Sequence, residues 1–140
     1  MISHLIKGGN VIIKKSILAI DDDREQLKMY AKFLGEHYFL IPVKSVSDAL
    51  KILDLINIDL ILLDIEMPNS GFDFMHEIRK KPKYMTKPII IVCVHNEPEY
   101  LNYVKNSCAT SVLTKPVDAV IMIKTIEEAL SARPKSPYGI

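Results

Sequence analysis

Cysteine is scarce in this sequence of 140 residues. Only Cys93 and Cys108 occur, and they lack the spacing of a metal-ligand set, so we expect buried, reduced thiols. No apolar run approaches the ~18 residues that span a bilayer, and residues 1–10 lack the apolar core of a signal peptide. These absences favour a cytoplasmic protein that does not enter a membrane.

Blocks of basic residues are also missing, and the formal net charge is only +1, so this domain is not expected to bind nucleic acid. The sequence contains no internal repeat. A composition that is 49% hydrophobic and 25% charged is ordinary for a globular domain, and the length accommodates one core. We expect the domain at residues 16–132, between an N-terminal extension (1–15) and a C-terminal tail or start of a linker (133–140).

Short β-branched runs alternate with longer stretches of helical periodicity, which predicts a doubly wound α/β domain with a mostly parallel sheet. Five strands are expected, at residues 16–20, 38–43, 60–63, 89–94 and 111–113. Five helices are expected, beginning near Asp23, Ser45 or Ser47, Gly71, Pro98 and Asp118. Pro42 indicates that its strand is at an edge or ends there. On the fourth helix, we expect Leu101, Val104 and Cys108 to share the apolar face.

Charged residues gather where the predicted strands end. Asp21, Asp22 and Asp23 follow the first strand, Asp64 follows the third, and Lys115 follows the fifth. Because the carboxyl ends of parallel strands form one edge of the sheet, these side chains are expected to lie together. Aspartates at such positions also cap helices, and Asp22 or Asp23 could have only that role.

A hard cation would explain several acids at one edge, because carboxylates that crowd together repel one another when buried. Magnesium prefers one or two carboxylates with phosphate and water, which Asp22 and Asp64 could supply, with Asp21 binding directly or through water. A carboxylate beside that ion can attack phosphorus to form an aspartyl phosphate, while Lys115 stabilises charge on the transferred oxygens.

Three segments resemble the receiver domain of two-component response regulators, in particular the chemotaxis-type receivers. Residues 17–23 resemble the apolar strand that leads into an acid pair, residues 62–68 the phosphoacceptor motif with Met-Pro three residues after aspartate, and residues 113–116 the lysine–proline motif. The likeness covers residues 16–132. It implies a flavodoxin-like (βα)5 three-layer sandwich whose five parallel strands have the order 2-1-3-4-5.

The resemblance also assigns roles. Asp64 is then the phosphoacceptor, served by a sensor histidine kinase or histidine phosphotransfer protein, and Lys115 assists the transfer. Magnesium is held by Asp21, Asp22, Asp64 and the backbone carbonyl of Glu66, and the Lys115–Pro116 bond is cis. The domain is a signalling module rather than an enzyme, although it catalyses its own phosphorylation and dephosphorylation. It acts on a downstream protein or output domain, and a homodimer is compatible with this reading.

Three positions depart from the family pattern. Cys93 occupies the usual Ser or Thr position at the end of the fourth strand, and Val112 replaces the switch aromatic. A thiol is a weak donor, so the loss of a charge-assisted hydrogen bond removes roughly 1.5–3 kcal/mol from the coupling between phosphorylation and conformation. Val94, where a small residue is usual, is expected to narrow access. We therefore predict a domain that accepts phosphate but switches weakly or by another route.

Two alternatives compete with this interpretation. A pseudo-receiver that binds proteins without phosphorylation is favoured by Cys93 and Val112 but opposed by the complete acid set. An enzyme of the haloacid-dehalogenase type would use Asp21 and Asp23. This interpretation leaves the motif at residues 64–68 unexplained, and the sequence has no room for the cap domain of such an enzyme. Tyr100 and Tyr103 lie off the predicted apolar face of their helix, which makes them candidates for a partner surface or ordinary exposed side chains.

Overall fold

The computed structural model describes residues 3–7, 10–69 and 71–132. Five parallel strands form the body of its sheet in the spatial order β3-β2-β4-β5-β6, which confirms the predicted order 2-1-3-4-5 for the parallel strands counted along the chain. The strands are β2 (Asn10–Ile20), β3 (Tyr38–Val43), β4 (Leu60–Asp64), β5 (Ile89–Cys93) and β6 (Ser111–Thr114).

Five α-helices alternate with these strands, as predicted: α1 (Arg24–Leu34), α2 (Val46–Leu55), α3 (Phe72–Lys80), α4 (Pro98–Lys105) and α5 (Ala119–Ser131). Side chains of Asp23, Ser45 and Asp118 accept hydrogen bonds from backbone N–H groups in the first turns of α1, α2 and α5. These caps satisfy donors that have no partner inside the helix, and they fix where each helix begins. A short 3-10 turn, η1 (Pro82–Tyr84), follows α3.

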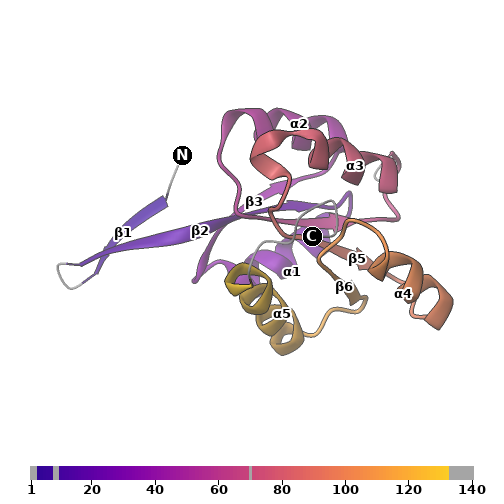
Figure 1. Cartoon of the computed structure of the whole chain (residues 1–140). Helices are drawn as coiled ribbons and strands as arrows, with labels where there is room; N and C mark the ends of the chain where they lie inside the picture. The colour runs from indigo at the N-terminus through magenta and orange to yellow at the C-terminus, as the bar shows by residue number, and fades with distance from the viewer. Residues whose placement is uncertain (1–2, 8–9, 70, 133–140) are drawn as a thin grey trace.

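The sheet is covered on both faces (Figure 1). Side chains of α2, α3 and α4 pack with alternate residues of β2, β4 and β5 in one core cluster, and side chains of α1 and α5 pack with the remaining residues in a second. Every residue of β4 and β5 is buried, which explains their continuous apolar sequences. The three-layer sandwich is therefore confirmed. Pro42 lies on β3, which pairs only with β2 among the described strands, as its edge assignment predicted.

The N-terminal segment differs most from expectation. β2 begins at Asn10 rather than at residue 16, and its first half pairs antiparallel with an additional strand, β1 (Ser3–Lys7). The two strands form an arm that extends away from the helices (Figure 1). The predicted division after residue 15 thus falls within β2, and the predicted tail at residues 133–140 lies outside the described residues.

The region around α4 corrects two smaller predictions. The helix ends at Lys105, so Cys108 follows the helix instead of sharing its apolar face. Ser107 accounts for this end, because its hydroxyl donates to the carbonyl of Val104 and accepts from the N–H of Ala109. Tyr100 is half-buried against the core, whereas Tyr103 is 59% exposed. No helix in the described part of the chain is both long and apolar enough to cross a bilayer.

Candidate functional site

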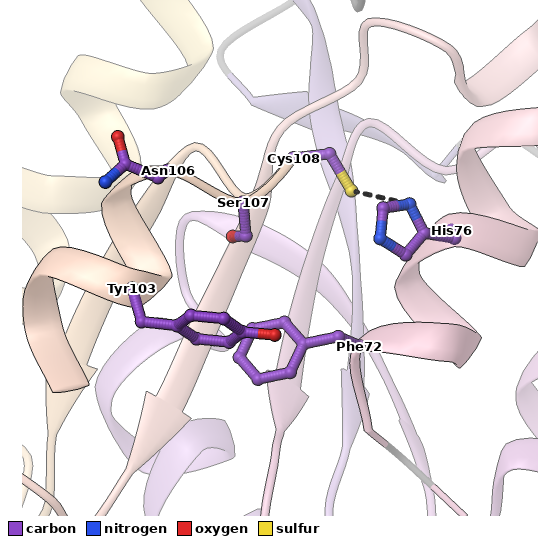
Figure 2. Close-up of a pocket in the computed structure, with 6 residues that line it drawn as sticks. All are labelled: Phe72, His76, Tyr103, Asn106, Ser107 and Cys108. Atoms are coloured by element: carbon purple, nitrogen blue, oxygen red, sulfur yellow. Dashed lines mark hydrogen bonds between the residues drawn. The ribbon is translucent and has the colours of Figure 1, made fainter.

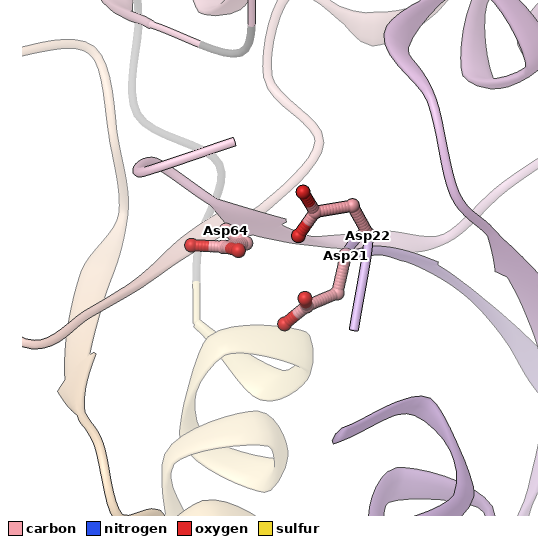
Figure 3. A group of neighbouring side chains, drawn as sticks. All are labelled: Asp21, Asp22 and Asp64. Atoms are coloured by element: carbon pink, nitrogen blue, oxygen red, sulfur yellow. The ribbon is translucent and has the colours of Figure 1, made fainter. Parts of the chain in front are cut away.

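Three carboxylates meet at the carboxyl edge of the sheet, where β2 and β4 are neighbours. Asp21 and Asp22 follow β2, and Asp64 is the last residue of β4. Figure 3 shows the three side chains turned toward a common space. One carboxylate oxygen from each lies within 4.8 Å of those from the other two. Asp21 and Asp64 are buried, while Asp22 is exposed. The sequence prediction that these acids lie together is confirmed.

Lys115 reaches this cluster from the segment after β6. Its Nζ atom lies 3.3 Å from Oδ2 of Asp21 and 3.5 Å from Oδ2 of Asp64. The amide of Lys115 donates to the carbonyl of Cys93 at 2.7 Å, which continues the pairing of β6 with β5 beyond the strand end. The next peptide bond, Lys115–Pro116, is cis, as the resemblance implied. A single ammonium therefore faces two buried carboxylates.

Backbone N–H groups hold the two buried carboxylates in place. Oδ1 of Asp21 accepts from the N–H of Asp23 at 2.9 Å, and Oδ1 of Asp64 accepts from the N–H of Glu66 at 3.1 Å. Each acid thus closes a turn with the residue two positions later, a conformation typical of aspartate after a strand. Because the turns fix one oxygen of each carboxylate, the other oxygen of each faces Lys115.

Burial and nearby charges shift the pKa values of Asp21, Asp64 and Lys115. Burial raises the pKa of Asp21 and of Asp64 above the ordinary value, and the hydrogen bonds from Asp23 and Glu66 only partly oppose this. Burial alone would lower the pKa of Lys115, but the charges of Asp64 and Asp21 outweigh it and raise that pKa. The two buried carboxyl groups share the ammonium of Lys115 as a charged partner.

The donor set suits a hard divalent cation. Asp21, Asp22 and Asp64 provide carboxylate oxygens only, the ligand type that Mg²⁺ prefers over nitrogen and sulfur. Exposure of Asp22 leaves one side of the cluster open to water, which Mg²⁺ retains in its coordination shell. A cation here would also offset the cost of burying Asp21 and Asp64, which raises their carboxyl pKa values. The residues fit the metal on these three grounds.

Asp23 lies outside the cluster. Its carboxylate accepts from the N–H of Glu25 and caps α1, so the capping interpretation holds for Asp23. His95 is an exposed loop residue, with its Nδ1 atom 3.4 Å from the Glu97 carboxylate.

The side chain of Glu66 is a feature that the sequence interpretation missed. Its Oε1 atom accepts from the N–H of Val94 at 2.8 Å, which links the loop after β4 to the loop after β5. The same carboxylate also acts on the neighbouring Asp64, whose pKa it raises in addition to the larger effect of burial. The position of Glu66, two residues after an acid at the strand end, is a signal that could have suggested this proximity.

Cys93 and Val112 lie on the β5–β6 side of the site. The Cys93 thiol is completely buried and donates to the carbonyl of His95 at 3.3 Å. Burial, followed by the charge of Glu66, raises the pKa of this thiol. Val112 is half-buried and packs against the core. Val94, expected to narrow access, is 56% exposed. This side of the site offers a thiol and an aliphatic chain.

A doubly wound fold with clustered acids and a lysine at the carboxyl edge defines a receiver-type signalling domain. The sequence pattern of the family described as the response regulator receiver domain matches residues 17–127. The chain belongs to this family.

Individual relatives agree with that assignment. The chain is 33% identical over 122 residues to the probable transcriptional regulator ycf29 of Cyanophora paradoxa, covering 83% of this chain and 56% of the relative. It is 27% identical to protein PilH of Pseudomonas aeruginosa, with 82% and 97% covered. It is 31% identical to the CAI-1 autoinducer sensor kinase/phosphatase CqsS of Vibrio cholerae, with 81% and 17% covered. The chain therefore spans 17% of the length of CqsS, 56% of ycf29 and 97% of PilH.

The solved structure of the chemotaxis response regulator CheY4 from Vibrio cholerae superposes with a TM-score of 0.78 at 27% identity, covering 84% of this chain and 99% of CheY4. A two-component response regulator from Clostridium difficile gives a TM-score of 0.75 at 24% identity, with 84% and 96% covered. Both similarities support the five-stranded receiver fold described above.

Proposed function

We propose that this chain is a phosphoacceptor in two-component signal transduction and that Asp64 receives the phosphoryl group. One observation carries the proposal: the Asp64 carboxylate lies beside Asp21 and Asp22 and within 3.5 Å of the Lys115 ammonium. An acid cluster with a single lysine at the switch edge of an α/β sheet is suited to charge compensation during phosphoryl transfer.

In this mechanism, an oxygen of Asp64 attacks the phosphorus of a phosphohistidine. The phosphorus–nitrogen bond breaks as the acyl phosphate bond forms, and the released imidazole takes up a proton. Lys115, already 3.5 Å from Asp64, approaches the transferred phosphoryl oxygens and stabilises their charge. Asp21, Asp22, Asp64 and the backbone carbonyl of Glu66 would hold Mg²⁺, which supplies further charge neutralisation when bound.

The donor in this scheme is a sensor histidine kinase or a histidine phosphotransfer protein, and the phosphorylated domain acts on a downstream protein or output domain. We assign it to the cytoplasm, where such donors work. The altered pair Cys93 and Val112 leaves the response to phosphorylation weak or routed through other residues, because neither side chain provides a strong hydrogen bond to a phosphoryl oxygen.

Intact-protein mass spectrometry after incubation with acetyl phosphate and Mg²⁺ tests the proposal. We expect the mass of one phosphoryl group on the wild type and no gain on Asp64→Asn or in the presence of EDTA. Asp48→Asn is the matched control, because Asp48 is an exposed acid of the first turn of α2 and is expected to leave phosphorylation unchanged.

Small phosphodonors and proteins differ in how they reach the site, so a set of histidine kinases and phosphotransfer proteins provides the second arm. Failure of every donor, with the protein folded by circular dichroism, would contradict the proposal and favour the pseudo-receiver interpretation. Phosphorylation of Asp64→Asn to the wild-type level would place the acceptor elsewhere.

A further inference from the structure

A pocket of about 380 Å³ lies outside the acid site, between α3 and the end of α4. Figure 2 shows its walls: Phe72 and His76 come from α3, Tyr103 comes from α4, and Asn106, Ser107 and Cys108 follow α4. The rings of Phe72 and Tyr103 meet edge to face at 4.8 Å between centroids. This volume lies within the usual range for small-molecule sites, about 300–1,000 Å³.

A thiol and an imidazole face each other at this pocket. The Sγ atom of Cys108 lies 3.8 Å from Nδ1 of His76, and the thiol is half-buried while the histidine is exposed (Figure 2). The titratable side chains in the pocket lining are His76, Tyr103 and Cys108. An imidazole at this distance can take the thiol proton or, once protonated, stabilise the thiolate.

Arg79 holds Cys108 in position and adds a positive charge. Its Nε and Nη2 atoms donate to the carbonyl of Cys108 at 3.1 and 2.8 Å, and its Nη1 atom donates to the carbonyls of Tyr84 and Lys87. A guanidinium with three carbonyl partners has little freedom to move, so its charge stays close to the cysteine. Reactive cysteines occur in partly exposed, electropositive surroundings of this kind.

Cys93 provides an internal comparison because it is the other cysteine of the chain. Its thiol is completely buried, donates to a backbone carbonyl and lies near the carboxylate of Glu66. Burial and nearby negative charge both disfavour a thiolate. One cysteine therefore has the surroundings of a structural thiol, and the other has access, a base and room for an adduct.

We propose that the Cys108–His76 pair is a thiol modification site that exchanges with small disulfides. His76 takes the thiol proton, and the Cys108 thiolate attacks one sulfur of the disulfide. A bond forms between Sγ and that sulfur, the original sulfur–sulfur bond breaks, and the departing thiolate takes up a proton from His76 or water. The disulfide is the oxidant, and the attached group occupies the pocket that Phe72 and Tyr103 line.

The test uses 2-hydroxyethyl disulfide and oxidised glutathione, with intact mass and peptide mapping to locate adducts. At neutral pH, we expect one adduct on Cys108 of the folded wild type, none on Cys93 and none on Cys108→Ser. His76→Gln should slow the exchange about tenfold, because proton removal then depends on water. His37→Gln is the matched control, since His37 is an exposed histidine between α1 and β3.

A second pH separates a base from a residue that only shapes the pocket. At about pH 9, where hydroxide and buffer base can remove the thiol proton in place of His76, we expect His76→Gln to approach the wild-type rate. The proposal is overturned if Cys93 and Cys108 react together only on unfolding, if His76→Gln matches wild type at neutral pH, or if its defect persists unchanged at the higher pH.

Discussion

The buried acids after β2 and at the end of β4, Asp21 and Asp64, both have a charged partner, whereas Cys93 of β5 and Val112 of β6 are uncharged side chains. Asp21 and Asp64 are held by backbone N–H groups and face Lys115. Cys93, in contrast, turns its thiol to the carbonyl of His95, and Val112 packs among apolar residues. Under the proposed function, the groups suited to accepting a phosphoryl group are therefore separate from Cys93 and Val112, the positions that would couple phosphorylation to a change in conformation.

The largest expected effect is on the rate of phosphorylation, when the charged partner of Asp21 and Asp64 is removed. Lys115→Met should slow phosphorylation by acetyl phosphate about 10²- to 10³-fold, because one preorganised positive charge near the transferred oxygens is lost. Phosphorylation rates by intact mass provide the measurement. Lys81→Met is the matched control, since Lys81 pairs with Asp54 on the surface away from the site. Equal rates for Lys115→Met and the control would contradict the role of Lys115.

An intermediate effect is expected on the β5–β6 side of the site. Cys93→Thr replaces the buried thiol with a hydroxyl that can donate to a phosphoryl oxygen. We expect it to strengthen the coupling between phosphorylation and conformation by roughly 1.5–3 kcal/mol. The measurement is the size of phosphorylation-induced NMR shifts in α4 and β6, with Cys93→Ala as the control that has neither donor. Identical shifts in the threonine and alanine variants would count against this prediction.

The smallest effect concerns pH and the metal. Because the pKa values of Asp21 and Asp64 are raised in the folded state, the folded protein binds more protons than the unfolded chain. Their stabilising contribution is complete below the ordinary pKa of 3.8 and is lost as pH rises through the raised values. Asp21→Asn should therefore stabilise the metal-free protein at neutral pH by about 1 kcal/mol and flatten this pH dependence.

Urea unfolding in EDTA across pH measures this difference, and added Mg²⁺ should stabilise the wild type more than Asp21→Asn. Asp48→Asn again serves as the control for loss of an exposed carboxylate. A wild type whose unfolding free energy rises from acidic to neutral pH in EDTA would contradict raised pKa values for the two buried carboxyl groups.

The sequence predicted most of what depends on short-range patterns. Asp21, Asp22, Asp64 and Lys115 could be placed together because parallel strands present their carboxyl ends at one edge. The C-terminal end of α4 could not be predicted as well, since its apolar spacing continued to Cys108 while Ser107 closed the helix by hydrogen bonds to the backbone. Spacing alone does not show which of two competing hydrogen-bond patterns prevails.

One local pattern was overlooked, and contacts between residues distant in the sequence were the other source of error. The antiparallel partner of β2 was missed even though Gly8 and Gly9 separate two apolar segments, a pattern that favours a hairpin. The contact from Glu66 to Val94 joins residues 28 positions apart, and the Cys108–His76 pair joins residues 32 positions apart. The first pair depends on the parallel pairing of β4 with β5, and the second depends on the placement of α3 beside the segment after α4, so no local pattern specifies either.

We propose that this domain accepts phosphate through an intact acid site but that phosphorylation changes its conformation weakly or by another route. Backbone NMR of the wild type, recorded with Mg²⁺ before and after phosphorylation by acetyl phosphate, tests it most directly. We predict large shifts for residues around Asp21 and Asp64 and small shifts along α4 and β6. Large, cooperative shifts throughout α4 and β6 would contradict this proposal, because they would show that phosphorylation changes the conformation of both elements.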